Sequence, residues 1–141
     1  AIIDYKIAET LTDRLDLKVI INCNLSRLSF LKKDYIKSIH YGRKALKGKS
    51  ISLPDKFFCI AKSNMAISYL KLSEPKTAYS LYYECFTNNG IKGNLEIIKE
   101  IRDDLIAHYK LGLDQPIVKK ILLDFVKVSN NELENILLKK N

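Results

Sequence analysis

The chain has 141 residues, of which 47% are apolar, and a formal net charge of +8 at neutral pH. This length predicts one domain or a short array with one continuous core. No apolar run approaches the roughly eighteen residues that a bilayer-spanning helix needs. The lysines are scattered and form no long basic block, which favours a solvated surface over a nucleic-acid-binding stripe.

Helical patterns fill the chain, and we find no convincing alternating strand pattern. The fold class that we predict is therefore all-α, with about eight helices joined by short connections. In chain order, the predicted helices span residues 1–11, 13–32, 34–47, 53–71, 73–88, 94–111, 115–128 and 130–140.

Local signals mark the ends of these helices. Asp34 is a typical N-cap, and Pro54 is typical of the first turn of a helix. The sequence TNNG at 87–90 and the glycine Gly112 each indicate the C-terminal end of a helix. Ser129 and Glu132 have the spacing of a capping box.

The chain repeats itself with a period of forty residues. Asn24 and Asn64 each open the same pattern, and a weaker third copy begins at Asp104. The turn sequences KKD at 32–34, LSE at 72–74 and GLD at 112–114 have the same spacing. A fixed period of this length indicates a stack of helix pairs, which usually offers a binding surface and performs no chemistry.

The repeated stretches resemble the tetratricopeptide repeat, a helix–turn–helix unit of interaction proteins. The residues that fall at the apolar and small positions of that family are Tyr5, Ala8, Leu25, Ser26, Ser38, Ala45, Met65, Ala66, Tyr69, Ala78, Tyr82 and Cys85. The sequence departs from the family pattern at Asn22, Gly42 and Lys62, and the usual Pro between units is absent at Ser50 and Gly90. The period is longer than the usual thirty-four residues and is similar to that of an extended-helix branch.

The resemblance implies a right-handed superhelical stack, or α-solenoid, within a single domain. A half-unit at 1–11 would precede units at 13–47, 53–88 and 94–128, and a terminal helix at 130–140 would follow. The chain begins at Ala1 inside a helical pattern, and it has no signal-peptide pattern. We therefore interpret it as a cytoplasmic fragment of a longer protein.

In this architecture the first helix of each unit lines the inside of the curve, and spacing places four residues of each such helix on one face. The expected peptide-binding groove comprises Ile20, Asn24, Arg27, Leu31, Ile60, Asn64, Ile67, Lys71 and Asp104. An Asn amide can pair with both the N–H and the C=O of one peptide residue. Asn24 and Asn64 would then form a ladder along an extended guest.

This use of asparagine resembles the bacterial peptide-sensing regulators of the Rap and PlcR type. The resemblance implies a non-catalytic module that binds a peptide or an extended protein segment, without a cofactor or metal. Nucleic acid would be contacted only through a missing N-terminal domain.

Other interpretations stay open at this point. Asn24 and Asn64 could instead hold helices together through interhelix hydrogen bonds. A co-chaperone adaptor would bind an acidic C-terminal peptide, but Ile60 and Asn64 stand where that branch needs cations. A third alternative is a purely architectural domain that forms a homodimer through residues 130–140.

No motif for catalysis or metal binding is present. His40 and His108 lack the spacing of metal ligands or of a nucleophile's base. Asp103 and Asp104 are adjacent, so we expect them on different faces of a helix and not as a catalytic pair. Cys23, Cys59 and Cys85 are widely spaced, which predicts buried free thiols.

Overall fold

The computed structural model describes residues 2–11, 14–48, 54–87 and 94–138. Within these ranges all regular secondary structure is α-helical, as the sequence predicts. The helices are α1 (Ile2–Leu11), α2 (Leu15–Leu31), α3 (Tyr35–Leu46), α4 (Asp55–Lys71), α5 (Pro75–Thr87), α6 (Leu95–Lys110), α7 (Gln115–Asp124) and α8 (Asn130–Leu138).

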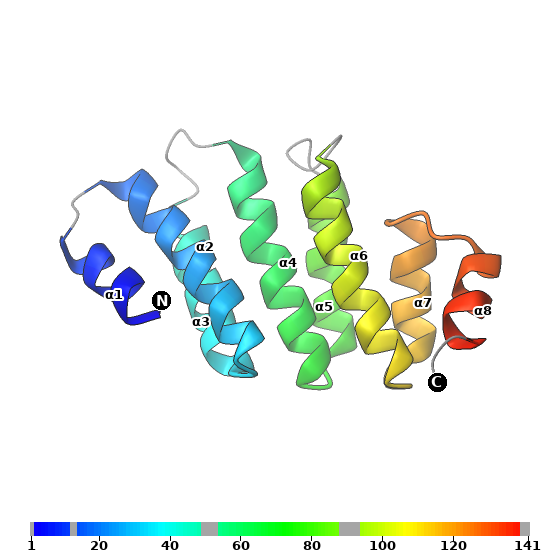
Figure 1. Cartoon of the computed structure of the whole chain (residues 1–141). Helices are drawn as coiled ribbons and strands as arrows, with labels where there is room; N and C mark the ends of the chain where they lie inside the picture. The colour runs from blue at the N-terminus through cyan, green and yellow to red at the C-terminus, as the bar shows by residue number, and fades with distance from the viewer. Residues whose placement is uncertain (1, 12–13, 49–53, 88–93, 139–141) are drawn as a thin grey trace.

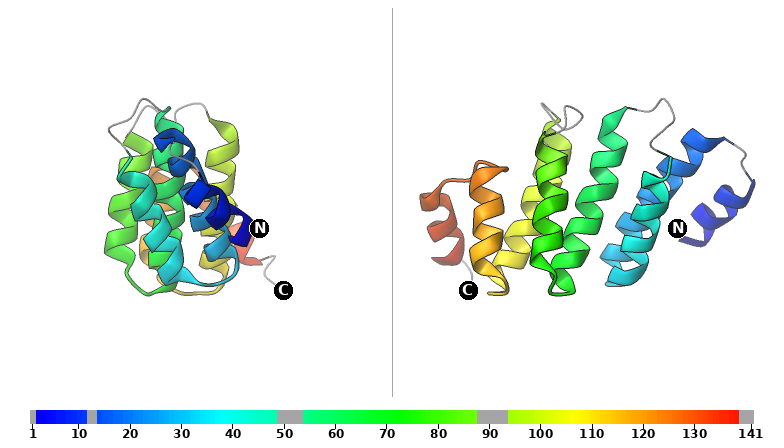
Figure 2. Two further views of the ribbon diagram at one scale, coloured as in Figure 1. Left: turned by 90° about the vertical axis from the view of Figure 1, so that its left-hand side faces the viewer. Right: turned by 180° about the vertical axis from the view of Figure 1, so that it is seen from behind.

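The helices are arranged in two rows (Figure 1). Helices α2, α4 and α6 lie side by side in the front row, and α3, α5 and α7 lie behind them, as the end-on view also shows (Figure 2). Helices α1 and α8 lie at the two ends of the array (Figure 1). No helix in the described ranges combines the length and the apolar character that a membrane crossing requires.

The predicted helix boundaries hold at most ends. The Asp34 carboxylate accepts a hydrogen bond from the Lys37 backbone N–H at 3.2 Å, and the Ser129 hydroxyl accepts one from the Glu132 N–H at 3.1 Å. Helix α7, however, ends at Asp124, so the predicted end at residue 128 is wrong. The chain leaves the helix at Phe125, whose ring stacks on Phe86 at 5.7 Å between centroids. The predicted stop at 87–90 lies largely outside the described residues.

The forty-residue period appears in the backbone of the turns. Lys33 and Ser73 both have left-handed backbones, with φ of 64° and 62°. In the first turn the Asp34 N–H donates to the Ser29 carbonyl at 2.8 Å. In the second turn the Glu74 N–H donates to the Tyr69 carbonyl at 2.9 Å. In the third turn the Gln115 side chain donates to the equivalent carbonyl, that of Tyr109, at 3.1 Å. This carbonyl also accepts from the Gly112 N–H at 3.0 Å, so the third turn adds a side-chain donor in place of the longer-range backbone one.

Small residues at equivalent positions bring paired helices together. The Ser26 hydroxyl on α2 donates to the Ser38 carbonyl on α3 at 2.7 Å, and Ala66 and Ala78 occupy the same places in α4 and α5. All four residues have no exposed surface. A side chain this small allows the two helix backbones to approach closely, which larger residues would prevent.

Helix α4 is the centre of the molecule because helices flank it on several sides. Every residue from Ala61 to Leu70 is buried. The largest core cluster joins α4 to α5, α6, α7 and α8, and smaller clusters join α2 to its neighbours. The three cysteines are buried and free, as predicted.

Candidate functional site

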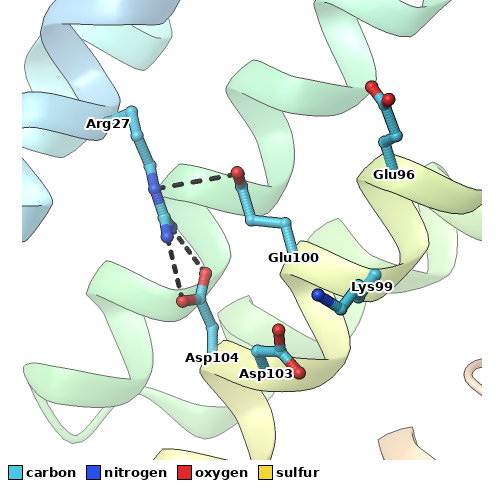
Figure 3. A pocket seen from close by; sticks show the side chains of 6 residues that line it. All are labelled: Arg27, Glu96, Lys99, Glu100, Asp103 and Asp104. Carbon is cyan, nitrogen blue, oxygen red and sulfur yellow. Dashed lines mark hydrogen bonds and ion pairs between the residues drawn. The ribbon is translucent and has the colours of Figure 1, made fainter.

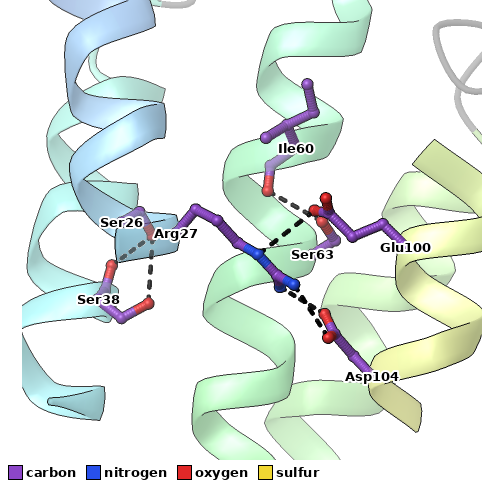
Figure 4. Close-up of polar contacts among 7 residues, drawn as sticks. All are labelled: Ser26, Arg27, Ser38, Ile60, Ser63, Glu100 and Asp104. Carbon is purple, nitrogen blue, oxygen red and sulfur yellow. Dashed lines mark hydrogen bonds and ion pairs between the residues drawn. The ribbon is translucent and has the colours of Figure 1, made fainter. Parts of the chain in front are cut away.

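An ion pair reaches across the front row of helices. The guanidinium of Arg27 on α2 donates from Nη1 and Nη2 to the two carboxylate oxygens of Asp104 on α6, at 2.6 and 3.1 Å. Arg27 Nε lies 3.7 Å from Glu100 Oε1 on the same helix. Because α4 lies between α2 and α6, the Arg27 side chain passes in front of it (Figure 4). The contact therefore joins helices that are not neighbours in the row.

The Arg27–Asp104 pair is largely shielded from water. The side chains are 23% and 16% exposed. Burial alone disfavours the charged guanidinium, but the hydrogen bond and charge of Asp104 outweigh that effect and raise the pKa of Arg27. The guanidinium also lies 5.1 Å from the centre of the Phe30 ring. Arg27 is thus held from several sides as a permanent cation.

A pocket of about 420 Å³ adjoins this ion pair (Figure 3). Its lining residues are Arg27, Glu96, Lys99, Glu100, Asp103 and Asp104. Four carboxylates against two cations make the lining acidic, although the whole chain carries a charge of +8. An acidic hollow on a basic protein attracts cationic groups and repels anions.

Buried polar side chains without hydrogen-bond partners lie on the central helices. Asn64 and Ser68, one turn apart on α4, are 1% and 0% exposed, and their side-chain polar atoms have no partner among the described residues. The same holds for the Tyr82 hydroxyl. Burial raises the pKa of Tyr82 well above its usual value, and the negative charge of Asp104 adds to the effect. The interior beneath the ion pair therefore contains unsatisfied hydrogen-bonding groups, which usually cost stability.

The predicted groove residues of α2 lie at the surface to different degrees. Ile20, Asn24 and Arg27 are partly exposed, and Leu31 is 59% exposed. Among the described residues, Asn24 has no hydrogen-bond partner. Its amide is partly exposed to solvent.

The equivalent residues of α4 are deeper. Asn64 and Ile67 are buried, Ile60 is partly buried, and Lys71 is partly exposed. Burial lowers the pKa of Lys71, which the charge of Asp104 partly offsets. Asn64 makes no interhelix hydrogen bond to a described residue, so that alternative role has no contact to support it.

Sequence reasoning placed Arg27 and Asp104 in one groove but did not foresee that they would pair. Spacing places Glu100 on the same face of its helix as Asp104, but the remaining pocket residues, Glu96, Lys99 and Asp103, were missed. The spacing of Glu96, Glu100 and Asp103 could have indicated them, because residues four and seven positions apart share one helix face. Asp103 and Asp104, expected on different faces, both border the pocket (Figure 3).

The site is suited to recognising charge. In the part of the chain that the structure describes, no three His, Cys, Asp or Glu side chains are grouped to hold a metal ion. His108, the histidine on α6, has no exposed surface and lies 3.6 Å from an Asp114 oxygen through its Nε2. Fixed carboxylates, one guanidinium and a partly exposed amide can bind and orient a partner through hydrogen bonds and charge.

Comparison with known proteins adds no relative. The sequence matches no protein-family model and no curated protein, and the structure matches no solved structure. The relation to tetratricopeptide repeats therefore stays a prediction that rests on the repeated residues themselves.

Proposed function

We propose that this chain is a non-catalytic binding module, an α-solenoid of tetratricopeptide type with a right-handed superhelical path. It binds a peptide or an extended protein segment across α2, α4 and α6. The observation that carries the proposal is the pocket beside Arg27 and Asp104, where charged side chains from two helices converge in front of a third. The equivalent turns at Lys33 and Ser73 support the stacking of like units.

The chemistry of the pocket favours a guest with a basic side chain. Glu96 and Asp103 are exposed carboxylates at the pocket and form no ion pair with another described residue. Glu100 and Asp104 already hold the guanidinium of Arg27, which is the geometry that an arginine of a guest would also seek. A guest cation between Glu96 and Asp103 would add to this network. A peptide with an acidic terminus, as in the co-chaperone alternative, would meet repulsion from the same carboxylates.

The partly exposed Asn24 gives the guest backbone a partner one turn before Arg27 on α2. Its amide can donate to a peptide carbonyl and accept from a peptide N–H, and each bond contributes about 1 kcal/mol net. Since the free energy from each hydrogen bond is small, useful affinity requires contacts with both the pocket and the Asn24 amide. By resemblance, the module would serve as the sensing or adaptor part of a bacterial cytoplasmic regulator, and any contact with nucleic acid would belong to another domain.

The proposal is tested by titrating labelled peptides of equal length that differ only in one central residue: Lys, Gln or Glu. We expect the Lys peptide to bind most tightly and the Glu peptide least tightly. The double variant Glu96→Gln/Asp103→Asn should weaken the Lys peptide about three- to thirty-fold, because each exposed pair contributes up to about 1 kcal/mol. Asn24→Ala should weaken all three peptides alike.

The matched control is Asp124→Asn/Glu134→Gln, which removes the same charge from exposed positions on α7 and α8. If this control weakens the Lys peptide as much as the pocket variant does, only the net charge matters and the pocket is not the site. Equal affinity for the three peptides would also contradict the proposal.

A second candidate is an architectural domain that pairs with another copy. The observation in its favour is apolar surface at both ends of the array, where Ile3 on α1 is 72% exposed and Leu138 on α8 is 81% exposed. Measuring the molar mass in solution across a range of concentrations tests this candidate. A dimer that Leu138→Ser abolishes would favour it, whereas a monomer at all concentrations would exclude it.

A further inference from the structure

A second pocket, of about 490 Å³, lies between α1, α2 and the end of α3, and it shares no lining residue with the pocket at Arg27. This volume is in the range of small-molecule sites, about 300–1,000 Å³. The lining residues that matter here are Glu9, Leu15, Lys18, Asn22, Lys44 and Lys47.

The charges in this pocket are unbalanced. Lys18, Lys44 and Lys47 face a single carboxylate, that of Glu9, which leaves an excess of two positive charges. Lys44 Nζ lies 3.0 Å from Glu9 Oε1, whereas Lys18 and Lys47 form no ion pair with another described residue. A phosphate monoester carries about −1.5 to −2 charges at neutral pH and would match this excess.

The pocket already holds one oxyanion group of the protein itself. Glu9 accepts a hydrogen bond from Lys44 and another from the Asn22 Nδ2. Burial raises the pKa of Glu9, but the hydrogen bonds of Lys44 and Asn22 outweigh burial and lower it. The protein therefore stabilises a carboxylate here in its charged form.

Asn22 supplies the second, independent sign of a ligand. Its side chain lines the pocket and the residue is only 3% exposed. The amide nitrogen donates to Glu9 and to the Lys18 carbonyl, while Oδ1 has no hydrogen-bond partner among the described residues. An acceptor in this position fits a ligand that also carries a hydroxyl or amino group. Leu15, which is 58% exposed, adds an apolar wall.

We propose that this pocket binds a small soluble organic phosphate that carries a hydroxyl or amino group. The phosphate oxygens lie against Lys18 and Lys47, the donor group reaches Asn22 Oδ1, and the carbon skeleton packs on Leu15. Lysine suits this role because its ammonium is a point charge that accepts any phosphate orientation.

The test is titration of the full chain with inorganic phosphate, glycerol phosphate and glycerol, followed by amide chemical shifts in NMR spectra. We expect saturable shifts at Lys18, Asn22 and Lys47 with both phosphates, and none with glycerol. Glycerol phosphate should bind at least threefold more tightly than inorganic phosphate, because only it carries a carbon-bound hydroxyl for Asn22. Vesicles with a phosphomonoester headgroup form a separate arm, and binding to vesicles alone would overturn the proposal of a soluble ligand.

Two variants with opposite expected effects make the test specific. Lys18→Gln/Lys47→Gln should weaken phosphate binding by about fivefold or more, since two partners of the anion are removed. Glu9→Gln should strengthen binding by about two- to fivefold, because it removes a like charge beside the anion. The control Lys119→Gln/Lys127→Gln changes the net charge equally at exposed positions. If the control weakens binding as much as the pocket variant does, or if Glu9→Gln weakens it, the site is not this pocket.

Discussion

His108 shows how burial of one residue sets a dependence on pH. The residue has no exposed surface, and its Nε2 lies 3.6 Å from the Asp114 carboxylate. Burial lowers the pKa of His108 and the charge of Lys71 lowers it further, while Asp114 partly offsets both. Because the pKa is lower in the folded state than in the unfolded state, the unfolded chain takes up the proton first as pH falls. His108 therefore contributes stability fully above its unfolded pKa of about 6.5 and loses this contribution below it.

We expect the free energy of unfolding to fall between pH 7.5 and 5.5, and to fall less in the variant His108→Gln. The uptake of one proton can change the free energy of unfolding by at most about 1.4 kcal/mol per pH unit. Urea unfolding at both pH values measures the difference. The pKa of Glu9 is also lowered on folding, but a carboxylate with a lowered pKa loses its contribution only as pH falls below about 4.5, outside this window. Equal slopes for the two proteins would contradict this assignment.

At the scale of helices, packing explains a departure from the repeat pattern. Gly42 on α3 stands where the tetratricopeptide pattern that the sequence resembles has an aromatic residue, and Met65 of α4 fills that space instead. A Cβ at Gly42 would lie 2.3 Å from Met65 Cγ and 2.7 Å from its Sδ. The two positions are therefore complementary: a small residue on one helix accommodates a large one on the next.

We expect Gly42→Ala to destabilise the protein by about 1–3 kcal/mol through overpacking, although alanine favours a helix by about 1 kcal/mol over glycine. Thermal or urea unfolding measures the change. The exposed exchange Ala107→Gly on α6 gives the intrinsic alanine–glycine difference in this protein. In the double variant Gly42→Ala/Met65→Ala the loss should be smaller than the sum of the two single losses by about 1 kcal/mol or more. Additive losses would mean that the two side chains do not compete for space.

At the scale of the whole molecule, the Arg27–Asp104 pair is a contact between units that are not adjacent. A stack of repeats is usually held together by neighbouring units alone. Here a half-buried ion pair ties α2 to α6 in front of α4 (Figure 4). The relative position of the first and third units is therefore restrained directly and not only through the helix between them.

We expect Arg27→Met and Asp104→Asn each to lower stability by about 1–2 kcal/mol, with a coupling energy of about 1 kcal/mol between them in a double-mutant cycle. The exposed pair Arg102–Glu132, at 3.3 Å and about half-exposed on both sides, is the matched control. Its coupling should be below about 0.5 kcal/mol and should vanish at high salt, because water and ions screen exposed pairs. Equal coupling energies for the two pairs would show that the position of Arg27 has no special effect.

Much of the fold could be predicted from local patterns. The cap at Asp34, the turns around Lys33 and Ser73, and the small residues Ser26 and Ala66 all act on neighbours along the chain or on the next helix. Their effects are visible in the sequence because helix geometry fixes which positions meet. Helix α7 ends earlier than predicted, and Phe125, the first residue after it, packs on Phe86 through a contact between distant residues that local patterns do not reveal.

The sequence by itself determined the helices, their order and the forty-residue period. Only the tertiary structure decided how the repeated positions differ: Asn24 is partly exposed and Asn64 is buried, although they are equivalent in the repeat. The reason lies in packing: α4 contacts α2, α3, α5 and α6, whereas α2 contacts α1, α3 and α4, and local sequence does not encode which helices cover a given face. The pairing of Arg27 with Asp104, seventy-seven residues apart, and the basic pocket beside α1 likewise arise from the way the units stack.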